Sequence, residues 1–147
     1  MRGRSCYTWG AVVFILSGAL HTVVHLQPPP KEHASVYEAM ANAKQTVAGM
    51  TFSVEGGMQL MSCYTSTFSM LSGLVALTLV GRCRDDAWLL RKLGALFALG
   101  AGVLAGFAFH YGIAPPALLY TITALLFAAA ALRAKKPAAS TTAAAPA

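Results

Sequence analysis

Residues 7–26 have the sequence YTWGAVVFILSGALHTVVHL, with no Asp, Glu, Lys or Arg among them. A membrane-spanning helix needs about 20 consecutive, mostly apolar residues. Tyr7 and Trp9 stand near one end of the stretch, where aromatic side chains commonly lie at a membrane surface. Three prolines follow at positions 28–30, and proline cannot continue a helix. The stretch therefore predicts a first transmembrane helix over about residues 7–26.

The rest of the chain contains further long stretches without charge. One extends from Glu55 to Arg82 and another from Lys92 to Arg133, where Pro115 and Pro116 interrupt it. The chain is 56% hydrophobic and only 11% charged, whereas soluble domains carry about 25% charged residues. We expect further helices over about residues 58–80, 87–111 and 115–132. The predicted fold class is all-α, a bundle of four transmembrane helices.

Charge predicts how this bundle is oriented. The net charge is +6, and nine of the eleven Lys and Arg residues flank the predicted helices on one side. They are Arg2, Arg4, Arg82, Arg84, Arg91, Lys92, Arg133, Lys135 and Lys136. Basic residues favour the cytoplasmic side, so we expect a multi-pass protein of the inner (cytoplasmic) membrane with both termini in the cytoplasm. The sequence lacks the basic stripe with interleaved aromatic residues that is typical of nucleic-acid binding, so we expect no nucleic-acid partner.

The predicted domain organisation is a single membrane domain over residues 1–136, followed by a disordered Ala/Pro/Ser/Thr tail over residues 137–147. A cleaved signal peptide is the alternative for the first stretch, with residues 17–19 as the cleavage site. The apolar residues continue past that site, which favours a retained helix.

The only long polar connection runs from Lys31 to Gly57 and falls on the extracytoplasmic side. Ser35 and Glu38 have the spacing of a capping box. Apolar residues at positions 36, 40, 43, 47 and 50 follow at steps of three and four. This spacing predicts an extra amphipathic helix. Gly56 and Gly57 are expected to break the chain before the next helix.

Small residues predict how the helices pack. A polar or small residue recurs every three or four positions on the second predicted helix, at Gln59, Ser62, Ser66, Ser69 and Gly73. Such residues mark packed faces in membranes. On the third helix, Gly102, Gly106 and His110 are spaced by four, which predicts a groove that packs on the first helix and leads to a histidine. Asp85 or Asp86 is the expected N-cap of that helix.

Three histidines gather toward the extracytoplasmic end of the predicted bundle. His21 and His25 share one face of the first helix, and His110 lies near the end of the third. With Glu55 they form a candidate ligand set for zinc or copper, and a first-helix histidine paired with His110 is a candidate axial pair for haem.

Two other interpretations of these histidines remain open. One is a polar pocket for a lipid or quinone headgroup, a small lipophilic ligand. The other is plain hydrogen bonding between helices. The sequence therefore predicts a His-rich polar site, and it assigns no enzymatic activity, oligomeric state or partner beyond the lipid bilayer.

Three short stretches resemble a family of small, uncharacterised bacterial four-helix membrane proteins. They are SGALH at 17–21, FSMLSGL at 68–74 and the Pro115-Pro116 pair before an apolar last helix. The resemblance spans about residues 8–132 and implies the four-helix membrane bundle without an activity. The layout is also similar to that of the DoxX-like four-helix membrane proteins, although the chain carries none of their motifs.

Overall fold

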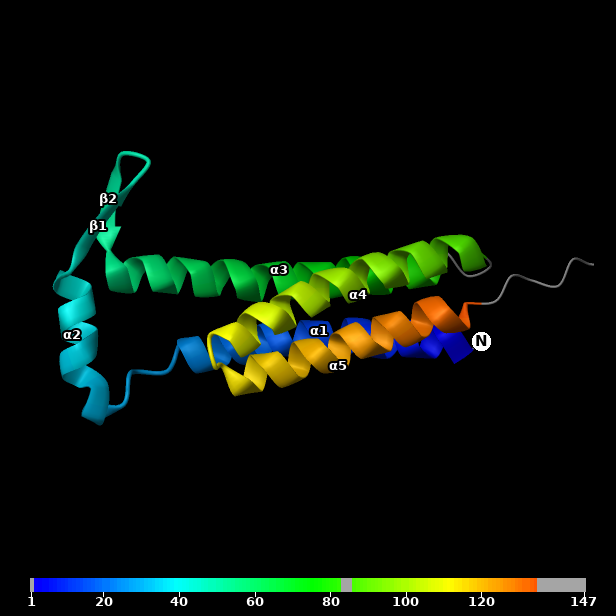
Figure 1. Cartoon of the computed structure of the whole chain (residues 1–147), viewed down its shortest axis with the longest axis horizontal. Coiled ribbons are helices and arrows are strands. Elements are labelled where there is room, and N and C mark those ends of the chain that lie inside the picture. The colour runs from blue at the N-terminus through cyan, green and yellow to red at the C-terminus, as the bar shows by residue number, and fades with distance from the viewer. Residues whose placement is uncertain (1, 83–85, 135–147) are drawn as a thin grey trace, which may run out of the picture.

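The computed structural model describes residues 2–82 and 86–134, most of them helical (Figure 1). The tail predicted over residues 137–147 lies outside these ranges. The elements in chain order are α1 Arg2–His25, η1 Lys31–His33, α2 Ala34–Asn42, β1 Lys44–Val47, β2 Met50–Ser53, α3 Val54–Arg82, α4 Ala87–His110 and α5 Ala114–Arg133. Four helices are long and apolar enough to cross a membrane, namely α1, α3, α4 and α5. The prediction of four such helices is confirmed, and they are typical of a multi-pass membrane protein.

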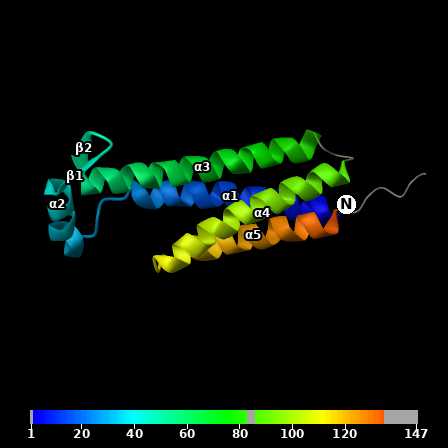
Figure 2. The ribbon, with the colours of Figure 1, turned by 45° about the horizontal axis from the view of Figure 1, so that its top comes forward.

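The four long helices alternate in direction along the bundle (Figures 1 and 2). α1 packs against both α3 and α5, and α4 packs along α5. We call the end of the bundle where α1 begins and α5 finishes the terminal end. The opposite end, which carries α2, β1 and β2, is the loop end.

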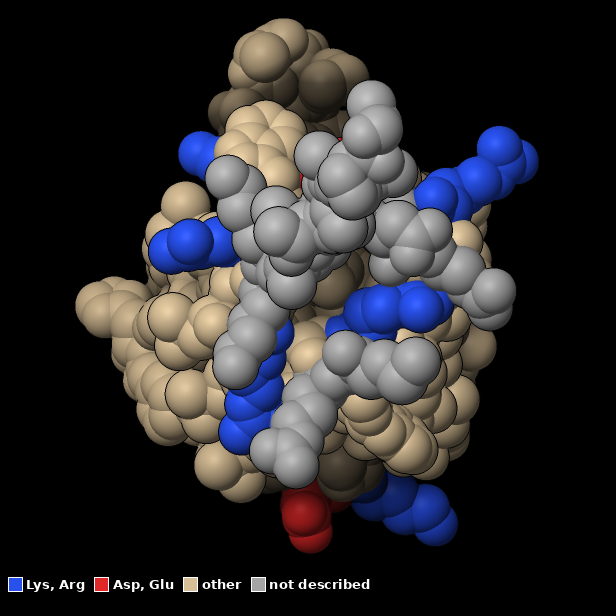
Figure 3. All heavy atoms as spheres, turned by 90° about the vertical axis from the view of Figure 1, so that its right-hand side faces the viewer, with Lys and Arg blue, Asp and Glu red and all other residues tan. Residues whose placement is uncertain are grey.

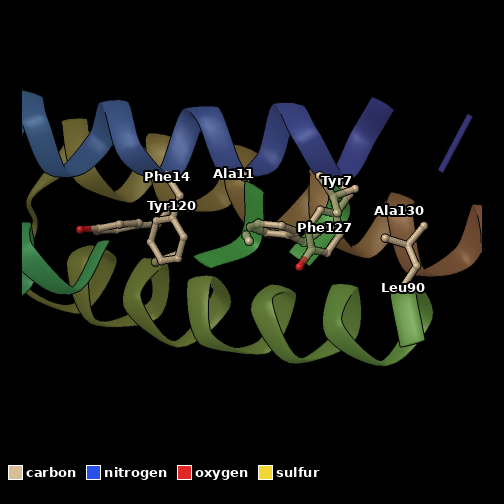
Figure 4. Packing of buried hydrophobic residues seen from close by; sticks show 10 residues of the cluster. Tyr7, Ala11, Phe14, Leu90, Tyr120, Phe127 and Ala130 are labelled. Carbon is tan, nitrogen blue, oxygen red and sulfur yellow. The ribbon is translucent and has the colours of Figure 1, made fainter. Parts of the chain in front are cut away.

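The core of the bundle combines aromatic rings of α1 and α5 with smaller side chains of all four long helices (Figure 4). Tyr7 of α1 meets Phe127 of α5 edge-on with ring centroids 5.0 Å apart, and Phe14 meets Tyr120 in the same way at 5.9 Å. Phe97 of α4 stacks on Phe127 at 5.1 Å. Edge-to-face and offset stacked rings are the favoured geometries for aromatic pairs. These rings therefore hold three helices together.

Glycines let α1 and α3 approach each other closely. A Cβ at Gly18 would lie 2.6 Å from the backbone oxygen of Ser66, and one at Gly73 would lie 2.7 Å from the backbone oxygen of Ala11. Of the five residues predicted to mark this face of α3, the buried ones are Ser66, Ser69 and Gly73. The predicted packed face is thus confirmed along its second half.

The glycines predicted to form a groove on α4 point outward instead. Gly102 and Gly106 are exposed, and a Cβ at either would meet no described atom within 4 Å. The buried face of α4 contains Ala101, Ala105 and Ala108. Since adjacent helical residues differ by about 100°, this face is rotated by that angle from the glycines. The predicted contact of the glycine groove with the first helix is wrong, because α4 packs on α5 through its alanines.

The segment between α1 and α3 differs most from its prediction. An extra helix is present, but α2 covers only Ala34–Asn42. Its N-cap position is His33, which makes no side-chain capping bond. Ser35 therefore lies inside the helix, and the predicted capping box is wrong.

A β-hairpin replaces the second half of the predicted amphipathic helix. β1 and β2 pair in antiparallel fashion, and Ala48 and Gly49 form the turn between them with φ angles of 49° and 81°. Two positive φ angles are what a type I′ hairpin turn requires. Thr46 and Thr51 face each other, and their hydroxyl oxygens lie 2.9 Å apart. This turn and the β-branched residues of the strands favour a hairpin over the helix that the spacing of the apolar residues predicted.

Two of the long helices begin at side-chain caps. Ser53 Oγ accepts a hydrogen bond from the backbone N–H of Gly56 at 3.0 Å, at the start of α3. Gly56 and Gly57 consequently lie inside α3, and the break predicted there is wrong. Asp86 Oδ1 accepts a hydrogen bond from the N–H of Leu89 at 2.9 Å, which confirms the expected N-cap of α4.

Candidate functional site

His21 and His25 lie on one face of α1 near the loop end, as their spacing predicts. Their rings are nearly parallel, with an interplanar angle of 3° and centroids 6.2 Å apart. His21 is half-buried and His25 is exposed. Within residues 2–82 and 86–134, neither imidazole makes a hydrogen bond. The interhelical hydrogen bond considered for His21 is therefore not formed in this structure.

His110 is the last residue of α4. Its side chain is exposed, and its ring meets that of Tyr111 edge-on at 5.0 Å. His110 follows Gly106 by four residues and so shares the outward face of α4. The rotation that turns the glycines outward also turns His110 away from the bundle.

Glu55 lies in the first turn of α3, and one of its carboxylate oxygens accepts a hydrogen bond from Gln59 Nε2 at 3.1 Å. Among the residues that the structure describes, no three His, Cys, Asp or Glu side chains gather closely enough to hold a metal ion. The ligand set of His21, His25, His110 and Glu55 predicted for zinc or copper is therefore not assembled. The axial pair of a first-helix histidine with His110, considered for haem, stays a prediction, and His110 shares the outward face of α4.

His21 instead lines a pocket between α1 and α5 near the loop end, with a volume of about 210 Å³. Its walls are Ser17, Leu20, His21 and Val24 of α1, Ile113 before α5, and Pro115, Pro116, Leu119 and Tyr120 of α5. Pockets that enclose drug-sized ligands measure about 300–1,000 Å³. This α1/α5 pocket is thus sized for one ring or headgroup, with the rest of a longer molecule outside it.

Hydroxyl groups in and beside the α1/α5 pocket differ in what they can still bond. Ser17 Oγ donates to the backbone oxygen of Val13 at 2.8 Å, so its hydrogen is used. Tyr120 and Ser69 are both buried, and their hydroxyl oxygens lie 3.0 Å apart. A single hydrogen bond between two hydroxyls uses one of their two hydrogens. When Ser69 is the donor, the hydroxyl hydrogen of Tyr120, which lines the pocket, is left for another acceptor.

His21 adds a second polar group to the pocket. A neutral imidazole has one N–H donor and one acceptor nitrogen, and neither is used by the described residues. The remaining walls are mainly aliphatic side chains and prolines. Such a pocket can hold an apolar molecule that presents a carbonyl or another hydrogen-bond acceptor.

The rim of the pocket is apolar and exposed. Leu20, Val24 and Ile113 expose 51%, 59% and 51% of their surface. In a bilayer, exposed apolar side chains of membrane-spanning helices contact the lipid acyl chains. A lipophilic molecule can therefore reach the pocket sideways, from the bilayer itself.

Sequence reasoning singled out His21 but missed the pocket that it lines. The pocket depends on the pairing of α1 with α5, which no local pattern encodes. The available signal was Tyr120 together with Ser69, because a polar side chain in an apolar span must find a partner when it is buried.

Comparisons with known proteins do not identify this chain. No family model, no curated protein and no solved structure matches it. The resemblance to small bacterial four-helix membrane proteins therefore stays a prediction, and the function is inferred from the geometry of the pocket.

Proposed function

We propose that the protein is a multi-pass protein of the bacterial cytoplasmic membrane that binds a lipophilic molecule in the α1/α5 pocket. The ligand presents a hydrogen-bond acceptor, as a quinone ring or the carbonyl of a lipid headgroup region does. The observation that carries the proposal is that Tyr120, whose hydroxyl is paired only with that of Ser69 among the described residues, and the half-buried His21 line the same pocket. Since an unpaired buried donor is destabilising, an acceptor that fills this place binds favourably.

The orientation proposed for the bundle puts the terminal end in the cytoplasm. The basic residues of the described helices at this end are Arg2, Arg4, Arg82, Arg91, Lys92 and Arg133. Figure 3 shows this end face-on, with blue Lys and Arg side chains spread over it. The described glutamates, Glu32, Glu38 and Glu55, all belong to the loop end. By the positive-inside rule, both termini are cytoplasmic and the pocket lies toward the extracytoplasmic surface.

Two histidine variants test the pocket against a matched control. His21 lines the pocket. His25 stacks on His21 one helical turn further along and does not line the pocket. Full-length protein is purified in detergent, and the retained small molecules are extracted and identified by mass spectrometry. His21→Ala is expected to lose the bound molecule, and His25→Ala is expected to keep it.

A third variant separates pocket volume from hydrogen bonding. Leu119→Trp fills the pocket and leaves His21 and Tyr120 in place, so it should also exclude the ligand. Separate titrations with a short-chain benzoquinone and with a diacyl phospholipid distinguish the two ligand sources. Equal retention by all three variants, or equal loss in both histidine variants, would contradict the proposal.

A further inference from the structure

We propose a second binding site, for a phosphate group, formed by Arg4 and Arg133 where α1 and α5 meet at the terminal end. It is independent of the α1/α5 pocket, which lies toward the other end of the same helices. Three features of the described residues support this site: the close approach of the two helices, one buried donor, and the absence of nearby carboxylates.

α1 and α5 are in close contact at the terminal end. A Cβ at Gly3 would lie 3.1 Å from the backbone oxygen of Ala130. Arg133 Nη1 donates a hydrogen bond to Cys6 Sγ at 3.4 Å. Gly3 also lies against Arg133 itself, because its Cβ would be 3.1 Å from the carbonyl carbon of Arg133. Arg4, the next residue of α1, therefore starts beside Arg133.

Both guanidinium groups have donor capacity to spare. Arg4 Nε is buried and has no hydrogen-bond partner among the described residues. The described hydrogen bond of Arg133 goes to a thiol, and sulfur is a weak acceptor. A guanidinium has five N–H donors and no acceptor, and it binds phosphate through two parallel hydrogen bonds. A phosphate oxygen is the acceptor that both side chains lack.

No carboxylate competes for these arginines in the part of the chain that the structure describes. Asp86 is the described acidic residue of the terminal end, and its side chain caps α4. The ion-pair contact found between described residues joins His33 and Glu32 at the loop end. The first turn of α1 contains no acidic residue either, so its free N–H groups add to the positive potential.

The depth of the site matches that of lipid phosphates. α5 has 20 residues, which at 1.5 Å each span about 30 Å, the thickness of the hydrocarbon layer. Arg133 is the last residue of α5, and Arg4 lies in the first turn of α1. An anionic phospholipid is therefore one source of the phosphate group, and free phosphate from the aqueous phase is the other.

Native mass spectrometry of the full-length protein tests the site. The protein is presented with equal amounts of phosphatidylglycerol and phosphatidylcholine in micelles of a detergent without phosphate groups, in a buffer without inorganic phosphate. Arg4→Gln and Arg133→Gln should each weaken phosphatidylglycerol binding by about tenfold or more, as loss of a charge-assisted hydrogen bond predicts. Arg91→Gln is the matched control, because Arg91 is exposed at the same end and loses the same charge. It should leave the binding unchanged.

Inorganic phosphate identifies the source of the phosphate group. If it binds to the detergent-purified protein and shows the same dependence on Arg4 and Arg133, the site takes free phosphate. If phosphatidylglycerol binds and inorganic phosphate does not, the site takes lipid.

Two results would overturn the proposal. One is an Arg91→Gln variant that loses as much binding as the other two, which would indicate diffuse charge attraction. The other is the absence of an effect in all three variants. Where a glutamine variant unfolds, Arg4→Lys or Arg133→Lys keeps the charge but removes the planar fork, and it should still weaken the binding.

Discussion

Replacement of Gly73 by alanine should destabilise the bundle, because the added methyl group meets the backbone of α1. Its Cβ would lie 2.5 Å from Ile15 Cγ1 and 2.7 Å from the backbone oxygen of Ala11. The Ile15 side chain can rotate away, but the Ala11 oxygen belongs to the helix itself. To turn 2.7 Å into an ordinary contact of about 3.4 Å, the two helices must separate by about 0.7 Å. Overpacking of this kind costs about 1–3 kcal/mol.

Gly102→Ala is the matched control for Gly73→Ala. A Cβ at Gly102 would meet no described atom within 4 Å. Alanine also favours a helix over glycine by about 1 kcal/mol, and this gain is common to both variants. The difference between their free energies of unfolding therefore isolates the overpacking, and it should be about 1–3 kcal/mol.

The assay is unfolding of the purified protein in mixed micelles by titrated sodium dodecyl sulfate, followed by circular dichroism. A difference below about 0.5 kcal/mol, the scatter of ordinary surface substitutions, would refute the close α1–α3 contact. A difference of opposite sign would mean that Gly102 is packed and Gly73 faces the lipid.

Four further predictions concern other parts of the chain. Reporter domains fused at the C-terminus and within residues 44–53 should lie on opposite sides of the membrane, with the C-terminus in the cytoplasm; a C-terminal reporter active outside contradicts the orientation. Asp86→Ala should cost about 1 kcal/mol in the unfolding titration, because α4 loses its N-cap. Ala48→Gly should raise hydrogen-exchange protection of residues 44–53 by about 1 kcal/mol, because a positive φ strains alanine and not glycine. Ser69→Ala should cost about 1–3 kcal/mol by leaving the Tyr120 hydroxyl unpaired, and adding Tyr120→Phe should recover part of that loss.

The positions of the long helices could be predicted from the sequence because they depend on local features. The last two were expected over about residues 87–111 and 115–132, and the structure has Ala87–His110 and Ala114–Arg133. The bounds of such helices depend on the length of each stretch without charged residues and on the position of proline, and only weakly on tertiary structure. The Asp86 cap is equally local, since its bond reaches only three residues along the chain.

The packed faces of the helices were harder to predict, because several small residues compete for the same role. Ser66 and Ser69 marked the packed face of α3 correctly, since polar side chains avoid lipid. On α4, Gly106 and Ala105 are adjacent and both small, so the sequence alone does not say which one is buried. Packing against α5 decides in favour of the alanine.

The candidate site was predicted only in part for a related reason. His21 and His25 were placed together correctly because four residues along one helix determine their separation. A site shared with His110 required α4 to pack beside α1. The helices that pack most extensively against α1 are instead α3 and α5. The α1/α5 pocket follows from this pairing, which brings Tyr120 and His21 to one cavity.

The two proposed sites lie toward opposite ends of one helix pair, and the aromatic core separates them. Tyr7, Phe14 and Phe127 fill the space between α1 and α5, and each exposes at most 2% of its surface. These buried rings therefore stand between the pocket and the arginines of the terminal end. Each site is reached from its own side of the bundle, so variants of His21 and of Arg133 should act independently, as distant sites without shared partners do.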